Sequence, residues 1–266
     1  MRHCYVVCLA VAVLLAFSPS LYAQVELVQI TPPPLRRAEP PAANASAEEL
    51  DARGDELRGQ KAYLDALDYY RAALAKKPSA SLYNKAGITE LELRRDKEST
   101  RDFERAVKFD HQFADAWNNL GVGWYLQQKY GRAIKEYEKA IKLKPDVASF
   151  YNNLGAAYYG RKEWEHATLA YGRALQLDPD IFERTSRTGV TAQLPSPEER
   201  ARFEYLIAKL YAKQGDSDHA LEYLRRAMEE GYPGINDVYK DSDFEGLRKD
   251  NRFAQLMASK PPAIPE

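Results

Sequence analysis

Histidine and cysteine are the residue types that most often bind metals or act in proton transfer, and this chain of 266 residues has four histidines and two cysteines. His111, His166 and His219 stand in different segments of the chain. None of them has a second ligand at the short spacing that a metal site on a helix requires. The sequence therefore predicts solvated or half-buried helix residues rather than a metal centre. His3 lies among the first residues of the chain.

Both cysteines, Cys4 and Cys8, fall within an apolar N-terminal run that extends to residue 17 and has a small residue, Ala23, soon after it. This pattern predicts a secretory signal peptide, residues 1–23, cleaved near Ala23. The 14-residue run is short for a membrane span, which needs about 20 residues. An uncleaved membrane anchor remains the alternative. Cleavage would leave a periplasmic or secreted chain with no cysteine, and hence no disulfide or thiolate.

The sequence has no pattern that predicts catalysis. It contains no glycine-rich phosphate loop, no nucleophile elbow and no paired His–Glu helix motif. Its net charge of −1, with acids and bases mixed along the chain, gives no electrostatic case for nucleic acid. We expect no enzyme activity, cofactor or metal. An enzyme with an unrecognised site in the 182–197 segment remains one alternative.

A four-residue pattern recurs along the middle of the chain. Gly54, Gly87, Gly121 and Gly155 are separated by 33, 34 and 34 residues. A period in this range is typical of a solenoid of two-helix units, which presents a binding surface. The glycines from residue 87 on each stand within the same pattern: Tyr83-Gly87-Phe103-Ala106, Trp117-Gly121-Tyr137-Ala140 and Tyr151-Gly155-Tyr171-Ala174.

The clearest unit runs from Ala114 to Pro145 and predicts two helices. Its apolar or small residues recur at i, i+3, i+4 and i+7, which places them on one face of each helix. We expect the two backbones to approach each other at Gly121 and Ala133, with Tyr137 filling the gap toward the next unit. Proline at the end of the unit stops the second helix. The stripes are Trp117, Leu120, Gly121 and Trp124, followed by Ala133, Tyr137 and Ala140.

These repeated positions resemble the tetratricopeptide repeat family over about residues 47–232. The resemblance implies an all-α, right-handed α-solenoid of helix-turn-helix repeats with a C-terminal helical cap. The second unit departs from the pattern at Ser99 and His111. Ser46 and the pair Ser196-Pro197 have the chemistry of helix starts. The expected segments are a signal peptide (1–23), a Pro-rich linker (24–46), four units (47–79, 80–113, 114–147, 148–181), a loop (182–197), a fifth unit (198–232), the cap (233–259) and a tail (260–266).

The resemblance also implies that the first helix of each unit lines a concave groove, where asparagines in the family contact the backbone of a peptide. An asparagine amide both donates and accepts, so it suits a peptide of any sequence. Alternatively, Asn119 and Asn153 match the family consensus and only tie adjacent helices together, which would leave Asn118 and Asn152 freer of structural duty. The expected groove residues are Asn84, Lys85, Asn118, Asn119, Val122, Tyr125, Asn152, Asn153 and Tyr159.

Some members of the family hold a terminal carboxylate with several lysines and arginines, but Lys85 stands alone at these positions. Acids in the first unit, Glu48, Asp51 and Asp55, instead indicate a preference for basic partners at one end of the groove. We therefore expect an exported adaptor or scaffold that binds a protein or peptide in the groove. A structural spacer or self-association module, with no open groove, is the main alternative.

Overall fold

The computed structural model describes residues 38–183 and 196–259, and these parts of the chain contain α-helices and short 3-10 helices but no strand. The signal peptide with His3 and both cysteines, most of the Pro-rich linker, most of the 182–197 loop and the C-terminal tail lie outside the described residues. No described helix is both long enough and apolar enough to cross a lipid bilayer.

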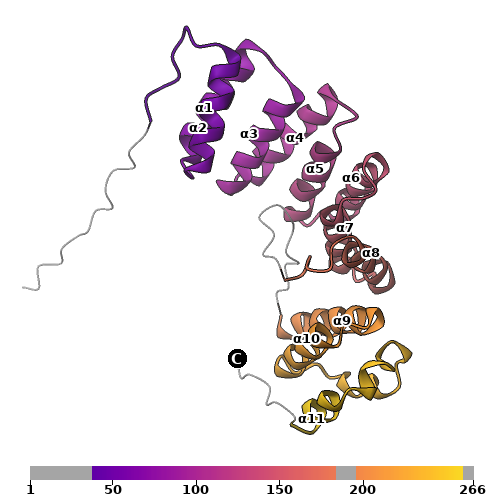
Figure 1. Cartoon of the computed structure of the whole chain (residues 1–266). Helices are drawn as coiled ribbons and strands as arrows, with labels where there is room; N and C mark the ends of the chain where they lie inside the picture. Colours follow the sequence, from indigo (N-terminus) through magenta and orange to yellow (C-terminus); the bar gives the residue numbers. More distant parts are fainter. Residues whose placement is uncertain (1–37, 184–195, 260–266) are drawn as a thin grey trace, which may run out of the picture. The chain divides into compact units, whose positions relative to one another are not determined.

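Ten of the helices form five consecutive pairs, and each helix packs against the next along the chain (Figure 1). The predicted all-α array of helix-turn-helix repeats is confirmed. The pairs are α1 (Ala47–Gly59) with α2 (Tyr63–Lys76), α3 (Ala80–Glu92) with α4 (Asp96–Phe109), α5 (Ala114–Leu126) with α6 (Tyr130–Leu143), α7 (Ala148–Gly160) with α8 (Trp164–Leu177), and α9 (Pro197–Gln214) with α10 (Ser217–Glu229).

Local sequence accounts for several helix ends. The Ser46 hydroxyl accepts from the amide of Glu49, whose carboxylate accepts from the Ser46 amide, which is a complete capping box at the start of α1. The Ser196 hydroxyl accepts from the amide of Glu199 at 3.2 Å and caps α9, with Pro197 at the first helical position. After α9, Gly215 has a φ of 82°, in the left-handed region that favours glycine.

The repeated glycines are the points at which an aromatic ring of the second helix lies directly on the first helix. A Cβ atom added at Gly121 would stand 2.5 Å from Cε1 of Tyr137, and the three nearest atoms all belong to that ring. The expectation that Gly121 meets Ala133 is therefore wrong, because the ring fills this space within its own repeat. The other pairs are Gly54 with Tyr70, Gly87 with Phe103, and Gly155 with Tyr171.

The two departures in the second repeat are accommodated by local hydrogen bonds. Ser99 is fully buried where other repeats have alanine, and its hydroxyl donates to the carbonyl of Asp96 in the same helix at 2.9 Å. That bond satisfies the hydroxyl without a partner from another element. The carbonyl of His111 accepts from Nε1 of Trp117 at 2.9 Å, so Trp117 is tied to the connection that precedes it and stays half-buried.

The C-terminal cap is also confirmed. It consists of η1 (Ile235–Tyr239), η2 (Ser242–Phe244), η3 (Leu247–Lys249) and α11 (Asn251–Ser259). Phe244, Leu247 and Phe253 are buried in the same hydrophobic cluster as the inward residues of α9 and α10. A guanidinium nitrogen of Arg248 donates to the carbonyls of Val238 and Asp241, at 2.8 Å each, and holds these short turns together.

The last residues of the expected linker lie against the first repeat. The hydroxyl of Tyr69 on α2 donates to the carbonyl of Glu39 at 3.0 Å, and the ammonium of Lys76 donates to the carbonyl of Ala43 at 2.8 Å. Ala38 and Ala45 pack against the hydrophobic cluster of this repeat. The chain just before α1 therefore covers part of the first repeat.

Candidate functional site

A hollow of about 730 Å³ opens across the first helices of the second, third and fourth repeats. Apolar side chains line it together with amides and a few charged groups, so it offers both dispersion contacts and hydrogen bonds. Of the nine predicted groove residues, Asn84, Asn118, Asn119 and Val122 line this hollow. The complete lining is Asn84, Ile88, Leu91, Glu92, Arg94, Asp115, Asn118, Asn119, Val122, Ser149 and Phe150.

Four asparagines form a chain of side-chain hydrogen bonds through three repeats. Nδ2 of Asn153 donates to Oδ1 of Asn118 at 2.9 Å, and Nδ2 of Asn118 donates to Oδ1 of Asn119 at 3.2 Å. Nδ2 of Asn119 then donates to Oδ1 of Asn84 at 2.9 Å. This asparagine chain joins α7 to α5 and α5 to α3, so it connects each first helix to the one before it.

The structure corrects the expectation about which asparagines have a structural role. Asn118 is only 4% exposed and bonds to two other asparagines, so it is not free of structural duty. Asn119 and Asn153 do tie adjacent helices together, as the alternative from the sequence proposed. Asn152, the residue one repeat after Asn118, is half-buried and lies outside the hollow.

Tyr125 and Tyr159 are buried, at 2% and 4% exposure, and do not line the hollow, which contradicts their expected place on the groove surface. The ring of Tyr125 packs against Tyr130, with centroids 5.3 Å apart. Tyr159 packs edge-on against Phe203 of α9, and its hydroxyl donates to the carbonyl of Glu199 at 2.7 Å. The first turns of α9 cover Tyr159 because α9 is longer than the other first helices.

Lys85 is engaged in ion pairs and does not line the hollow. Its ammonium lies 2.8 Å from Asp51 and 2.6 Å from Asp55. Burial raises the pKa of Asp55, but hydrogen bonds from Lys85 and Tyr70 outweigh that effect, so the pKa is lowered overall. Glu48 pairs with Lys77 at 2.8 Å. Each of these three acids is thus paired with a lysine of the chain, and the preference for basic partners at this end of the groove stays a prediction.

Seven lining residues are not among the nine predicted groove residues: Ile88, Leu91, Glu92, Arg94, Asp115, Ser149 and Phe150. Arg94 has a φ of 59°, so it leaves α3 in a left-handed turn that a helical spacing rule does not place. Asp115, Ser149 and Phe150 lie in the first turns of α5 and α7. The repeated apolar and small residues identify the middle of each helix. The residue types at the helix ends do not repeat, so the sequence pattern did not identify these lining residues.

Among the described residues, no group of three or more histidines, cysteines and acids is arranged to hold a metal ion. His111 and His166 are exposed and His219 is half-buried. The ring of His166 stacks on Tyr158, with centroids 5.0 Å apart. Nδ1 of His219 lies 2.7 Å from the carboxylate of Asp216, and this hydrogen bond raises the pKa of His219.

Three family models match the chain where the helix pairs lie. A "TPR repeat" model matches residues 124–162, and two "Tetratricopeptide repeat" models match residues 148–181 and 201–230. These matches agree with the helix pairs and with the glycine–aromatic contacts that recur in them. The chain therefore contains tetratricopeptide repeats at these residues.

Solved structures of MamA have the same fold. One is 21% identical, covers 74% of this chain and 95% of its own, and has a TM-score of 0.51. Residues 41 to the end of MamA from Desulfovibrio magneticus RS-1 are 18% identical, covering 71% of this chain and 97% of that one with a TM-score of 0.52. A double mutant of MamA RS-1 is 18% identical, covers 76% of this chain and 99% of its own, and has a TM-score of 0.52. A search of curated proteins finds no match.

Proposed function

We propose that this chain is a non-catalytic, exported adaptor that binds an extended peptide segment of a partner protein in the hollow across α3, α5 and α7. Tetratricopeptide repeats support a protein-interaction role. The main support for a peptide-binding site is the open hollow of about 730 Å³ on the first helices of three successive repeats. A spacer or self-association module would need no open groove, so the hollow favours the adaptor.

The lining suits a peptide with an apolar side chain among polar backbone groups. Ile88, Leu91 and Val122 supply half-buried apolar surface on α3 and α5, and covering it contributes roughly 25 cal/mol per Å². Asn84 and Asn119 face the same hollow. An amide has two N–H groups and two lone pairs, and the asparagine chain uses only part of this capacity, so hydrogen bonds to a peptide backbone remain available.

The experiment is a selection of binding peptides from a phage-displayed random library, followed by calorimetry with a selected peptide. Val122→Glu places a charge in the hollow and should weaken binding about tenfold or more, because the charge must be desolvated. Leu169→Glu is the matched control, since Leu169 is 73% exposed on α8 and lies outside the hollow. Equal binding by the wild type and the Val122→Glu variant would overturn the site.

Export is the second part of the proposal, and the apolar run followed by Ala23 supports it. We expect the mature chain to begin near Gln24 and to be periplasmic or secreted. The intact mass of the chain recovered from a periplasmic extract tests this. A chain that retains residues 1–23 in a membrane fraction would contradict cleavage and favour an anchor.

A further inference from the structure

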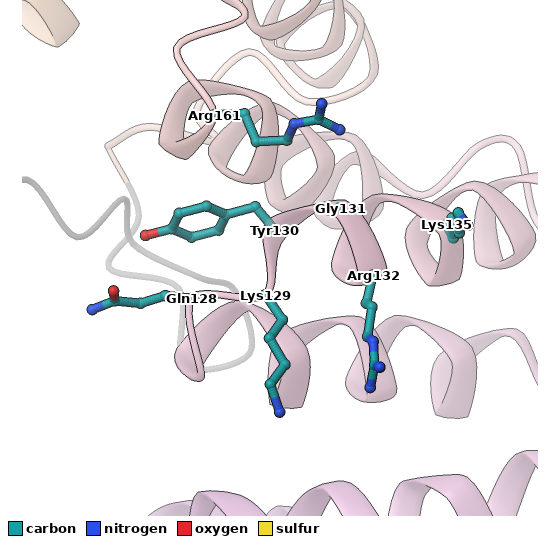
Figure 2. A pocket seen from close by; sticks show the side chains of 7 residues that line it. All are labelled: Gln128, Lys129, Tyr130, Gly131, Arg132, Lys135 and Arg161. Atoms are coloured by element: carbon teal, nitrogen blue, oxygen red, sulfur yellow. The ribbon is translucent and has the colours of Figure 1, made fainter.

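A second hollow, of about 610 Å³, lies at the turn between α5 and α6 and beside the end of α7 (Figure 2). Four cationic side chains line it: Lys129, Arg132, Lys135 and Arg161. These four residues are here named the basic patch. None of them belongs to the hollow on the first helices, and no acid is among the residues that line the second hollow.

Two contacts between neighbouring repeats build this hollow. A Cβ atom at Gly160 would stand 2.8 Å from Cζ of Tyr130, so the tyrosine ring lies directly on the end of α7. A Cβ atom at Gly131 would stand 3.6 Å from a guanidinium nitrogen of Arg161, so that side chain lies beside the start of α6. The ring and the guanidinium therefore each reach across from one repeat to the next at this hollow.

The local charge differs from that of the rest of the molecule. The full chain has a net charge of −1, whereas the basic patch has four cations. One of them, Arg161, pairs with Glu163 at 2.7 Å. Of the five second helices in the described repeats, α6 alone has no acid in its first turn. Acids stabilise a helix start and cations do not. Stabilisation of the start of α6 therefore does not account for Lys129 and Arg132.

The directions of the side chains indicate the shape of the ligand. Lys129 and Arg132 extend on one side of the start of α6, and Arg161 lies on the other side (Figure 2). The cations therefore surround the hollow and do not converge on one point. A compact anion could contact only some of them, whereas an extended segment with several negative charges could contact all of them.

The aromatic rings at this site favour a peptide over single-stranded nucleic acid. Lys129 and Arg132 lie over the ring of Trp124, at 4.8 and 4.9 Å from its centroid. The ring of Tyr130 packs against Tyr125 and lies on Gly160. Surfaces that bind single strands offer open aromatic faces on which bases stack, whereas these rings already contact the cations, Tyr125 and Gly160.

We propose that the basic patch is a second interaction surface, which binds an acidic segment of a partner protein independently of the hollow on the first helices. Each ion pair formed at such an exposed surface is weak, so the binding energy comes from several pairs acting together. Binding should then fall steeply as salt screens the charges.

The experiment measures the affinity of a fluorescent oligoglutamate peptide for the full chain at low salt and then with added NaCl. The double variant R132E/K135E should weaken binding about tenfold or more, which corresponds to two lost contacts and added repulsion. The control is K97E/R101E, which makes the same charge change at exposed positions of α4, the second helix of the preceding repeat. R132Q/K135Q should give an intermediate loss and serves as the test should the reversed variant fail to fold.

Three results would overturn the proposal. Oligoglutamate could bind R132E/K135E as tightly as the wild type, or the control could lose as much affinity as the test variant. Alternatively, an oligothymidine strand could bind more tightly than oligoglutamate and be lost in R132E/K135E, which would assign the patch to nucleic acid. Val122→Glu should leave oligoglutamate binding unchanged, so failure of the first-helix site and failure of the basic patch are distinguishable.

Discussion

Nδ2 of Asn119 donates to Oδ1 of Asn84, 2.9 Å away in the preceding repeat, and Nδ2 of Asn153 donates to Oδ1 of Asn118 over the same distance and the same sequence offset. One hydrogen bond is thus repeated between successive first helices. It shows that asparagines on the surface predicted to bind a peptide also join the repeats. Substitutions at these positions therefore change stability as well as any ligand contact.

Asn118→Ala should destabilise the chain by about 1–3 kcal/mol. The side chain is buried and bonds to two other asparagines, so its removal leaves buried polar groups without these partners. Asn152→Ala is the matched control, because Asn152 is the equivalent residue one repeat later and is half-buried. Its effect should be about 0.5 kcal/mol or less. Urea unfolding followed by circular dichroism measures both, and equal effects would contradict a structural role for the asparagine chain.

Gly121→Ala should lower the thermal midpoint, although alanine favours a helix. The added Cβ would meet three atoms of the fully buried Tyr137 ring at 2.5–2.9 Å. Overpacking of this kind typically costs about 1–3 kcal/mol, more than the gain of up to about 1 kcal/mol in helix propensity. Gly59→Ala, at the end of α1, meets nothing within 4 Å and should be neutral or slightly stabilising. A Gly121→Ala chain that melts no lower than the wild type would show that the ring can move aside.

The fold was predictable because its determinants repeat. Gly121, Tyr137 and their equivalents are separated by fixed intervals, and each repeat confirms the assignment made in the others. The partner of Gly121 was not predictable in the same way. Spacing shows that two residues lie on facing stripes, but only the observed rotamer shows that the ring of Tyr137, and not the Ala133 methyl, covers the glycine.

The site was less predictable because its determinants do not repeat. Tyr125 and Tyr159 have the spacing of groove residues, yet Tyr130 packs against one and the start of α9 covers the other. The length of α9 follows an interruption in the repeats, so no other repeat predicts it. Lys85 also has the spacing of a groove residue, but it forms ion pairs with Asp51 and Asp55, which are distant in the sequence.

Stability should depend on pH through Glu90, which is 3% exposed. Burial, followed by the nearby charge of Asp102, raises the pKa of Glu90 to about 7 from an ordinary value of 4.5. The facing charges are Arg71 on α2, which contacts both carboxylates, and Arg105 on α4, 3.0 Å from Asp102. The folded chain therefore binds this proton more tightly than the unfolded chain. This contribution to stability is complete below about pH 4.5 and is lost as the pH rises through about 7.

The test compares the wild type with Glu90→Gln, which keeps a hydrogen-bond donor but cannot titrate. The stability of the wild type relative to the variant should fall by on the order of 1–3 kcal/mol between pH 4.5 and pH 8. Taking the difference removes carboxylates that titrate alike in both chains, such as Asp216 and Asp241. A difference that does not change with pH would show that Glu90 is ionised throughout.

The hydroxyls of tyrosines at equivalent positions should have opposite effects on the free energy of unfolding. The hydroxyl of Tyr70 donates to Asp55 at 2.7 Å and accepts from Nε of Arg58 at 3.2 Å, whereas the buried hydroxyl of Tyr137 has no hydrogen-bond partner among the described residues. The second repeat has Phe103 at this position, so the packing accepts a ring without a hydroxyl. Tyr70→Phe should destabilise the chain by about 1–2 kcal/mol.

Tyr137→Phe, in contrast, should leave the free energy of unfolding unchanged or raise it by up to about 1 kcal/mol. It removes a buried hydroxyl whose burial costs free energy without a compensating bond, and it keeps the ring that packs on Gly121. Tyr171→Phe repeats the test one repeat later, where the hydroxyl is buried in the same way. Urea unfolding of the three variants under one buffer gives the comparison. If Tyr137→Phe lost as much stability as Tyr70→Phe, a partner such as a buried water would have to satisfy the Tyr137 hydroxyl.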